Sequence, residues 1–189
     1  MSGPTLLSAE EFADRKFELP EGGRWTELCA GEIVTLSPPD ELNGNVVPNL
    51  SKVLAEHAQK AQDGYACFEL GLIVARSPDT VRCPSVSYFQ SGERFAESDK
   101  LVTETIPTLV VEIASTNDRR RHVDERVTSY LNWGVGQVWL ADTDLREIHI
   151  FQSDAHRQRL SSGDTLHGGK VLSEFRSKVE DLFATPSWY

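Results

Sequence analysis

The sequence has few cysteines, and those it has follow no recognisable pattern. Cys29, Cys67 and Cys83 make an odd count and lack C-x-x-C spacing. A disulfide framework needs paired cysteines, and a zinc ribbon needs closely spaced pairs, so neither kind of site is indicated. We therefore expect a protein of the reducing cytoplasm.

Long hydrophobic runs are absent as well. The longest uncharged apolar stretches, such as LGLIVA at residues 70–75, fall far short of the ~20 residues that a membrane helix needs. Residues 1–12 lack the basic region and apolar core of a secretory signal, so we expect no such signal. The sequence predicts no segment that crosses a membrane.

Positive charge is also scarce. The chain carries 19 Lys and Arg against 29 Asp and Glu, a formal net charge of −10. This excess opposes the broad basic surface of a protein that coats nucleic acid. It does not exclude a local site, because a metal ion held by carboxylates can itself meet a substrate phosphate. The one dense basic cluster in the sequence is Arg119, Arg120 and Arg121.

In other respects the composition is that of an ordinary globular protein. Hydrophobic residues make up 39% and charged residues 25% of the sequence, which has no low-complexity tract and no internal repeat. A chain of 189 residues can bury a substantial core but is too short for two independent domains. We expect a single domain over residues 1–189.

The first third of the chain predicts a helix, two strands and a second helix. Ser8 and Glu11 have the spacing of a capping box, which predicts a short helix. Residues 25–36 (WTELCAGEIVTL) indicate two short strands around a turn. Residues 44–62 place apolar side chains at intervals of three and four, as on one face of a helix. Pro48 is tolerated only in a first turn, so this helix should begin near residues 44–46.

The middle of the chain predicts a hairpin, formed by residues 65–75 and 80–89 around a turn. Pro84 in its second strand indicates an edge or a bulge beside Ser85. A short helix is expected at residues 92–98. Further strands and helices follow in alternation, which predicts an α/β or α+β domain with a mixed central sheet covered by helices.

A glutamate inside an apolar strand is the most informative feature of the sequence. Glu112 lies within the run at residues 109–114 (LVVEIA), where an unpaired carboxylate would cost several kcal/mol. On the helix that follows, Arg126 shares its inward face with Val123 and Tyr130. Two interpretations stay open: a structural pair of Arg126 with Glu112, or a metal site of two carboxylates with a cation nearby.

Three stretches carry a resemblance to a known family: RWTELCAGEIVTLSPP at 24–39, PDTVRCPSVSYF at 78–89, and LVVEIASTNDRRRHVDERVTSYLNWGVGQVWLAD at 109–142. Each short match is weak, but their order and spacing together resemble the Uma-type restriction endonuclease family of the PD-(D/E)XK nuclease superfamily. The resemblance implies a restriction-endonuclease-like fold, with a mixed central sheet flanked by helices.

The resemblance also implies a chemistry, namely hydrolysis of DNA phosphodiester bonds with Mg²⁺, and it implies a homodimer. In the family, an aspartate after a proline and a glutamate on the next strand hold the ion, and a lysine orients the attacking water. By position, Glu112 is the metal glutamate and Glu27 the glutamate of the family's first motif. The candidate substrate-binding residues are Arg119, Arg120, Arg121 and Tyr130.

Two departures from the family pattern put this chemistry in question. Ser85 stands where the family has aspartate, and a neutral hydroxyl is a poorer ligand for a hard cation. Arg126 stands where the family has lysine, and a guanidinium does not surrender a proton. Glu69 is a weak replacement for the lost carboxylate, because a two-residue turn in the hairpin would place it on the other face from Ser85.

The candidate catalytic residues are therefore Glu112, Arg126, Ser85 and Glu27, around a metal site that has lost part of its donor set. We expect a nuclease-fold protein that is weakly active or inactive as an enzyme. The alternative is an active Mg²⁺-dependent DNA endonuclease that uses Glu112 and Glu27. A third possibility is a subunit that supports an active paralogue within a dimer.

Overall fold

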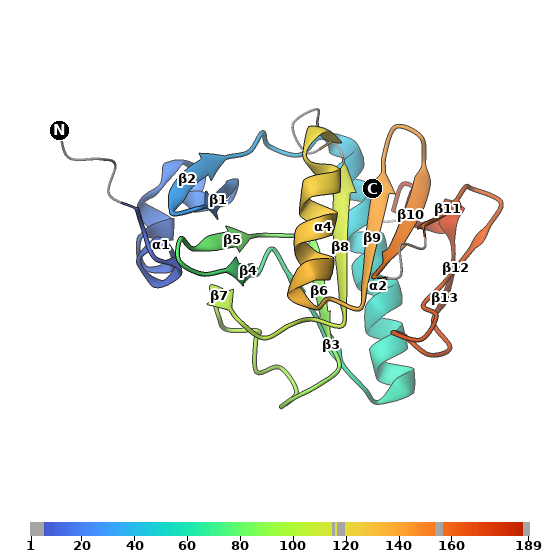
Figure 1. Cartoon of the computed structure of the whole chain (residues 1–189). Helices are drawn as coiled ribbons and strands as arrows, with labels where there is room; N and C mark the ends of the chain where they lie inside the picture. Colours follow the sequence, from blue (N-terminus) through green and yellow to red (C-terminus); the bar gives the residue numbers. More distant parts are fainter. Residues whose placement is uncertain (1–5, 115, 117–119, 154–156, 187–189) are drawn as a thin grey trace.

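The computed structural model describes residues 6–114, 116, 120–153 and 157–186 (Figure 1). Its helices are α1 (Ala9–Arg15), α2 (Glu41–Ala61), α4 (Val123–Trp133) and α5 (Val179–Leu182), with 3₁₀ helices η1 (Lys16–Glu18) and η2 (Pro20–Gly23). The strands are β1 (Thr26–Cys29), β2 (Glu32–Thr35), β3 (Tyr65–Phe68), β4 (Gly71–Ala75), β5 (Thr80–Arg82), β6 (Val86–Phe89), β7 (Val102–Thr103), β8 (Leu109–Ala114), β9 (Gln137–Asp142), β10 (Glu147–Gln152), β11 (Arg157–Leu160), β12 (Thr165–His167) and β13 (Arg176–Lys178).

The strands form two main sheets. The larger sheet has the order β11-β10-β9-β8-β6-β3, the smaller one the order β2-β1-β5-β4-β7, and β12 pairs with β13. In the larger sheet β8 and β9 are parallel while their outer neighbours are antiparallel, so the sheet is mixed. Helices α4 and α2 cover opposite faces of it, as Figure 1 shows. This arrangement confirms the expected restriction-endonuclease-like α/β (α+β) fold.

The predicted hairpin joins the two sheets. Its lower part, β3 with β6, belongs to the larger sheet, and its upper part, β4 with β5, belongs to the smaller one. Pro84 lies between β5 and β6, at the point where the chain leaves one sheet for the other. The expectation that Pro84 lies inside a strand is therefore wrong. Because proline has no N–H to donate to a ladder, the break between two strands suits it.

Helix α1 confirms the capping box, since the Ser8 side chain accepts a hydrogen bond from the N–H of Glu11 and the Glu11 side chain accepts one from the N–H of Ser8. Helix α2 begins earlier than expected, at Glu41, so Pro48 lies inside it rather than in its first turn. Proline removes one hydrogen bond of the helix ladder. The apolar face of α2, which is buried from Val46 onward, offsets that loss.

Residues 92–98 form a series of turns and not the expected short helix. Phe95 has a left-handed backbone conformation, with φ of 67°, which interrupts any helical ladder. Its ring packs on Tyr65, with the ring centroids 5.2 Å apart. A contact with the edge of the sheet thus replaces the local helix.

Strand β8 determines the position of the candidate site. Its alternate residues Leu109, Val111 and Ile113 pack in the core under α2, whereas Val110 faces the core under α4. Glu112 shares the second face, because side chains alternate along a strand. Among the described helices, none combines the length and apolar character that crossing a bilayer requires.

Candidate functional site

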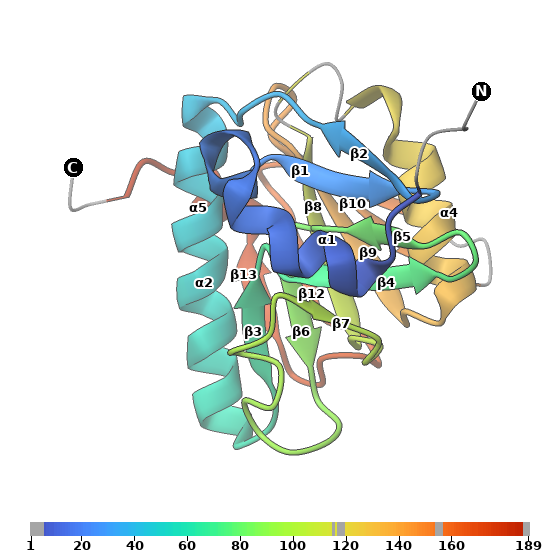
Figure 2. The same ribbon diagram turned by 90° about the vertical axis from the view of Figure 1, so that its left-hand side faces the viewer.

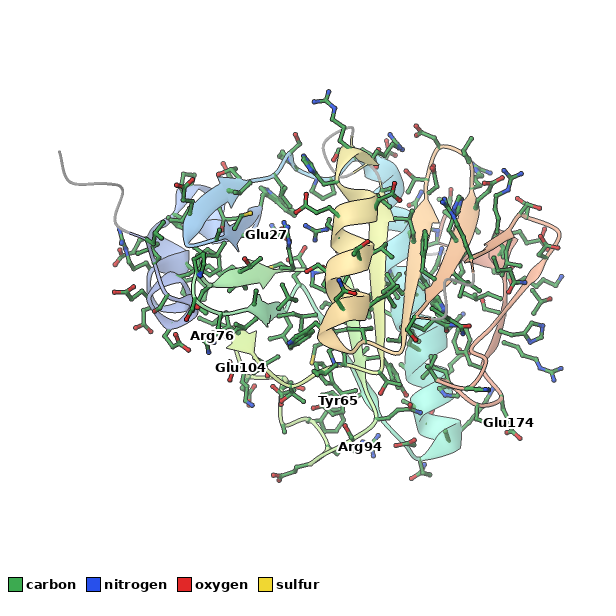
Figure 3. All side chains as sticks on the ribbon, viewed as in Figure 1. Glu27, Tyr65, Arg76, Arg94, Glu104 and Glu174 are labelled. Carbon is green, nitrogen blue, oxygen red and sulfur yellow. The ribbon has the colours of Figure 1, made fainter. Side chains whose placement is uncertain are left out.

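Three elements bring the site residues together. Strand β8, buried along its whole length, presents Glu112, and helix α4 presents Arg126 from above the sheet. Strand β1 of the smaller sheet presents Glu27, which Figure 3 shows between that sheet and α4. Only 1% of Glu27, 5% of Glu112 and 4% of Arg126 is exposed to solvent. The site is thus a buried junction between the two sheets.

The guanidinium of Arg126 occupies the space between the two carboxylates. Its Nη1 and Nη2 atoms donate to the two oxygens of Glu27, at 2.6 and 2.8 Å. Its Nε and Nη2 atoms donate to Oε1 of Glu112, at 2.9 and 2.7 Å. Arginine suits this position because its planar fork can meet a carboxylate at two points. The sequence-based interpretation of a structural pair between Arg126 and Glu112 therefore has the matching geometry.

Tyr130, one helical turn after Arg126, completes the contacts of Glu112. Its hydroxyl donates to Oε1 of Glu112 at 2.6 Å, and it lies 3.3 Å from Nη2 of Arg126. Tyr130 is fully buried. The sequence predicts that Tyr130 binds substrate, but a buried side chain cannot contact a nucleic acid while the helix stays in place. Tyr130 instead belongs to the interior cluster.

Arg82 and the backbone of Cys83 complete the contacts of Glu27. Nη1 of Arg82 lies 3.3 Å from Oε2 of Glu27, and its Nη2 donates to Glu125 at 2.6 Å. The N–H of Cys83 donates to Oε1 of Glu27 at 2.7 Å. The two buried glutamates thus meet two arginines, and their formal charges cancel. We call Glu27, Glu112, Arg82, Arg126 and Tyr130 the arginine cluster.

The pKa values in the arginine cluster follow from this arrangement. Burial alone would raise the pKa of Glu27, but Arg126, the Cys83 N–H and Arg82 outweigh it and hold that pKa below its ordinary value. Burial also opposes the charge on Arg126, yet Glu112 and Glu27 keep its pKa well above the ordinary one. Burial raises the pKa of Tyr130 strongly. Glu27 and Arg126 are therefore a stable charged pair, and Tyr130 remains a donor.

Ser85 directly precedes β6, the strand that pairs with β8. The last pair of the ladder between β6 and β8 joins Val86 to Val111, so Ser85 and Glu112 are the next residues beyond it. Ser85 is buried and lines a cavity of about 220 Å³. Glu112 lines a separate and much smaller space.

Glu69 corrects a prediction about the hairpin. The last pair of β3 with β6 joins Phe68 to Val86, so Glu69 and Ser85 are the next residues beyond it, and both line the same cavity. The expectation that Glu69 lies on the other face was wrong. A bulge between Ile73 and Ala75 shifts the pairing of β4 with β5, so the register does not follow from a simple two-residue turn.

The basic cluster of the sequence is only partly accessible. Arg120 lies 2.9 Å from Asp144 in an ion pair, whereas Arg121 is exposed. Arg119 lies outside the described residues. An arginine that is already paired contributes less to phosphate binding, so Arg121 is the more available of the two described side chains.

The donor set does not fit a magnesium ion. Mg²⁺ requires near-octahedral oxygen ligands, but both oxygens of Glu27 and one of Glu112 are occupied by hydrogen-bond donors. The space beside Glu112 and Arg126 measures about 10 Å³, close to the room that one water needs. Within the described ranges, no three His, Cys, Asp or Glu side chains form a group that could hold a metal.

Arg82 is the site residue that the sequence analysis missed. The available signal was charge balance, because two buried glutamates need more than the single positive charge of Arg126. No local pattern points to Arg82 as the second cation. Its strand reaches the site only because the hairpin crosses from one sheet to the other.

Comparisons with known proteins agree with this fold. The family model Uma2, described as a putative restriction endonuclease, matches residues 9–180. A solved structure of a putative nuclease belonging to DUF820 from Anabaena variabilis matches with a TM-score of 0.75 and 19% sequence identity. The match covers 94% of this chain and 97% of that one, and at this identity it shows the fold alone. No curated protein matches the chain.

Proposed function

Because the chain belongs to the Uma2 family of putative restriction endonucleases, we propose that it is a nuclease-fold protein whose metal-dependent hydrolysis is lost or severely weakened. The observation that carries the proposal is the position of the Arg126 guanidinium, which bonds both Glu27 and Glu112. In this proposal, a fixed side-chain cation stands in the place that the family gives to a metal ion.

Displacing this guanidinium would be costly. A metal ion that took the carboxylates of Glu27 and Glu112 would leave Arg126 buried and unpaired, and breaking a buried ion pair costs about 3–5 kcal/mol. Ser85 supplies no charge to offset that cost. To bind here, Mg²⁺ would have to displace Arg126 from both carboxylates. This supports a weak or absent affinity of the site for Mg²⁺ at millimolar concentration.

The chemistry of the other side chains supports the same proposal. Family hydrolysis needs a group that orients or deprotonates a water molecule, and a lysine can do this when its pKa is lowered. Arg126 stays protonated, and its pKa is raised further by Glu112 and Glu27. It can stabilise negative charge but cannot act as a base.

The test is a magnesium titration of the wild type and of Glu112→Gln, followed by thermal unfolding. A ligand that binds the folded state stabilises it by RT ln(1 + [L]/Kd). We expect equal, small shifts in both proteins, since any Mg²⁺ that collects on an acidic surface affects them alike. We also expect no nicking of plasmid DNA. A shift abolished by Glu112→Gln, together with nicking, would instead support an active endonuclease that uses Glu112 and Glu27.

A homodimer is the second part of the proposal. Strand β2 is an edge of the smaller sheet, and all four of its residues are exposed, with Ile33 and Val34 among them. Unprotected apolar edge strands favour pairing with another chain. An antiparallel pairing of two β2 strands around Val34 would place Glu32 opposite Leu36 of the second copy, so no like charges would meet.

Three further expectations belong to this proposal. Nucleic acid is the proposed partner, supported by the nuclease family. A single domain is supported by a family-model match that spans residues 9–180. A cytoplasmic location is supported by the free thiols of Cys29, Cys67 and Cys83.

A further inference from the structure

Three cavities meet around Phe68, and one of them adjoins the arginine cluster at Cys83. The largest, of about 460 Å³, lies between the segment after α1, the end of β3 and residues 97–101. A second, of about 220 Å³, reaches Ser85, and a third, also of about 220 Å³, lies between α2 and Phe95. Figure 2 shows α1, β3 and the chain between β6 and β7 on one side of the molecule. Because Phe68 lines all three cavities, we call them together the phenylalanine groove.

The phenylalanine groove exposes several large apolar side chains. Phe17 is 71% exposed, Phe95 54%, Phe68 39% and Leu101 38%. Aromatic rings are the side chains on which nucleic-acid bases stack. The groove therefore offers stacking surfaces at three separated positions, given by the three phenylalanines.

Unpaired cations accompany these rings. Arg24 lies 5.0 Å above the ring of Trp25, and Arg94 lies 4.9 Å above that of Phe95. Neither arginine, nor Lys16, forms an ion pair within the described part of the chain, whereas the arginines of the arginine cluster do. Figure 3 places Arg94 beside Tyr65, and both line the third cavity.

The acidic groups in the groove leave a positive balance. Glu97 is buried and lies 3.0 Å from Lys100, so these two charges cancel. Glu69 is the remaining carboxylate that lines the three cavities, against Lys16, Arg24 and Arg94. The whole chain carries a net charge of −10, whereas the side chains that line these cavities are positive on balance. The charge of the groove complements a polyanion.

From these observations we infer that the phenylalanine groove binds single-stranded nucleic acid and does so without cleaving it. That the ligand is a nucleic acid rests on the proposed function. That it is single-stranded follows from the exposed rings and the positive charges of the groove. Bases inside a duplex present only their edges, so exposed rings can stack only on bases that are unpaired. A strand lying in the groove would run from Ser85, past Phe68, to Phe95.

The binding test uses fluorescence anisotropy with a short labelled oligothymidylate, in the presence of EDTA. We expect saturable binding of the oligothymidylate and weaker binding of a duplex of the same length. Phe17→Ala and Phe95→Ala should each weaken binding about 5- to 100-fold, the range for loss of one stacked base. Arg24→Gln should weaken it less and should reduce the slope of log K against log salt by about 0.7.

Matched controls lie in the turn between β9 and β10, whose residues Leu145 and Arg146 line none of the three cavities. Leu145 is 63% exposed and Arg146 is exposed, so Leu145→Ala and Arg146→Gln remove similar groups outside the groove. Both should leave binding unchanged. Thermal unfolding of every variant confirms that the fold is intact, as expected for exposed positions.

The outcomes separate this inference from the proposed function. Three results would overturn the inference that the groove binds single-stranded nucleic acid: no binding, equal binding of the duplex, or equal effects of the control variants. None of them would affect the proposal that hydrolysis is lost. Binding of poly-glutamate with the same sensitivity to Phe17→Ala would assign the groove to acidic peptides and also overturn it. Cleavage of the bound oligothymidylate on adding Mg²⁺ would contradict the proposed function, and with it the claim that the groove only binds.

Discussion

Arg126 and Glu27 form a two-point ion pair across 99 residues of sequence, with both contacts shorter than 3.0 Å. The pair joins α4, which covers the larger sheet, to β1 of the smaller sheet. Arg126 also holds Glu112 on β8. One guanidinium thus connects three elements that are distant in the sequence.

Arg126→Met should destabilise the protein by about 3–5 kcal/mol, because two carboxylates would remain buried without their main partner. Urea unfolding of the wild type and the variant measures the difference. Arg121→Met is the matched control, since Arg121 is exposed, and it should change stability by no more than about 0.5 kcal/mol. A loss below about 1 kcal/mol for Arg126→Met would mean that the pair contributes little.

The stability of the wild type should fall as the pH drops below 4.5, the ordinary pKa of a glutamate. The folded-state pKa of Glu27 lies below that value, so its contribution is present above pH 4.5 and is lost as the pH falls towards the folded-state pKa. Glu27→Gln should be less stable near neutral pH but should show a shallower acid decline. Glu18→Gln, at an exposed position, should follow the wild-type curve.

Ser85→Asp combined with Arg126→Lys should restore a magnesium response. Ser85 and Glu112 are the residues next to the Val86–Val111 pair of the β6–β8 ladder. An aspartate at position 85 should therefore bring two carboxylates together, and their repulsion favours a cation between them. Lysine would return a compact ammonium in place of the planar fork. Thermal unfolding should then show a rise in Tm with Mg²⁺ in the double variant and little change in the wild type.

Plasmid nicking gives the second measurement for that double variant. Nicking should appear in the double variant alone. If the wild type responds to Mg²⁺ and Glu112→Gln abolishes the response, the site was never lost. If neither protein responds, Ser85 does not take the place of the family aspartate.

Val34→Lys should convert the proposed dimer to a monomer. Leu36 donates to Trp25 at 2.7 Å, so the alternate residues Ile33 and Thr35 turn their backbone groups to the outer edge of β2. A lysine at Val34 would set two like charges side by side at the centre of the pairing. Light scattering should give a dimer mass for the wild type and for Leu145→Lys, and a monomer mass for Val34→Lys. A monomeric wild type would refute the proposal.

The sequence predicted part of the site for clear physical reasons. The helical spacing of Arg126 and Tyr130, set against a glutamate in an apolar strand, was enough to predict that Arg126 faces Glu112. Glu27 entered only through the family resemblance, since no local pattern links β1 to α4. Arg82 was missed because the path of the hairpin between two sheets decides its neighbours.

The errors in the predicted fold have similar causes. The register of Glu69 against Ser85 depends on a bulge between Ile73 and Ala75 that leaves no mark in the residue types. Helix α2 continues through Pro48 because its buried face stabilises the helix beyond what local preference allows. Contacts between segments that are distant in the sequence determine both the place of Glu69 and the course of α2 through Pro48. A local sequence pattern therefore cannot predict either feature.

The contacts of Arg126 also determine which parts of the protein unfold together. Amide protons exchange with solvent through local or subglobal unfolding, in contiguous cooperative units. Because α4, β1 and β8 share one guanidinium, the smaller sheet cannot separate from the larger one without leaving charges unpaired. Amides of β1 should therefore exchange together with those of α4, as a single unit, although the two belong to different layers of the fold.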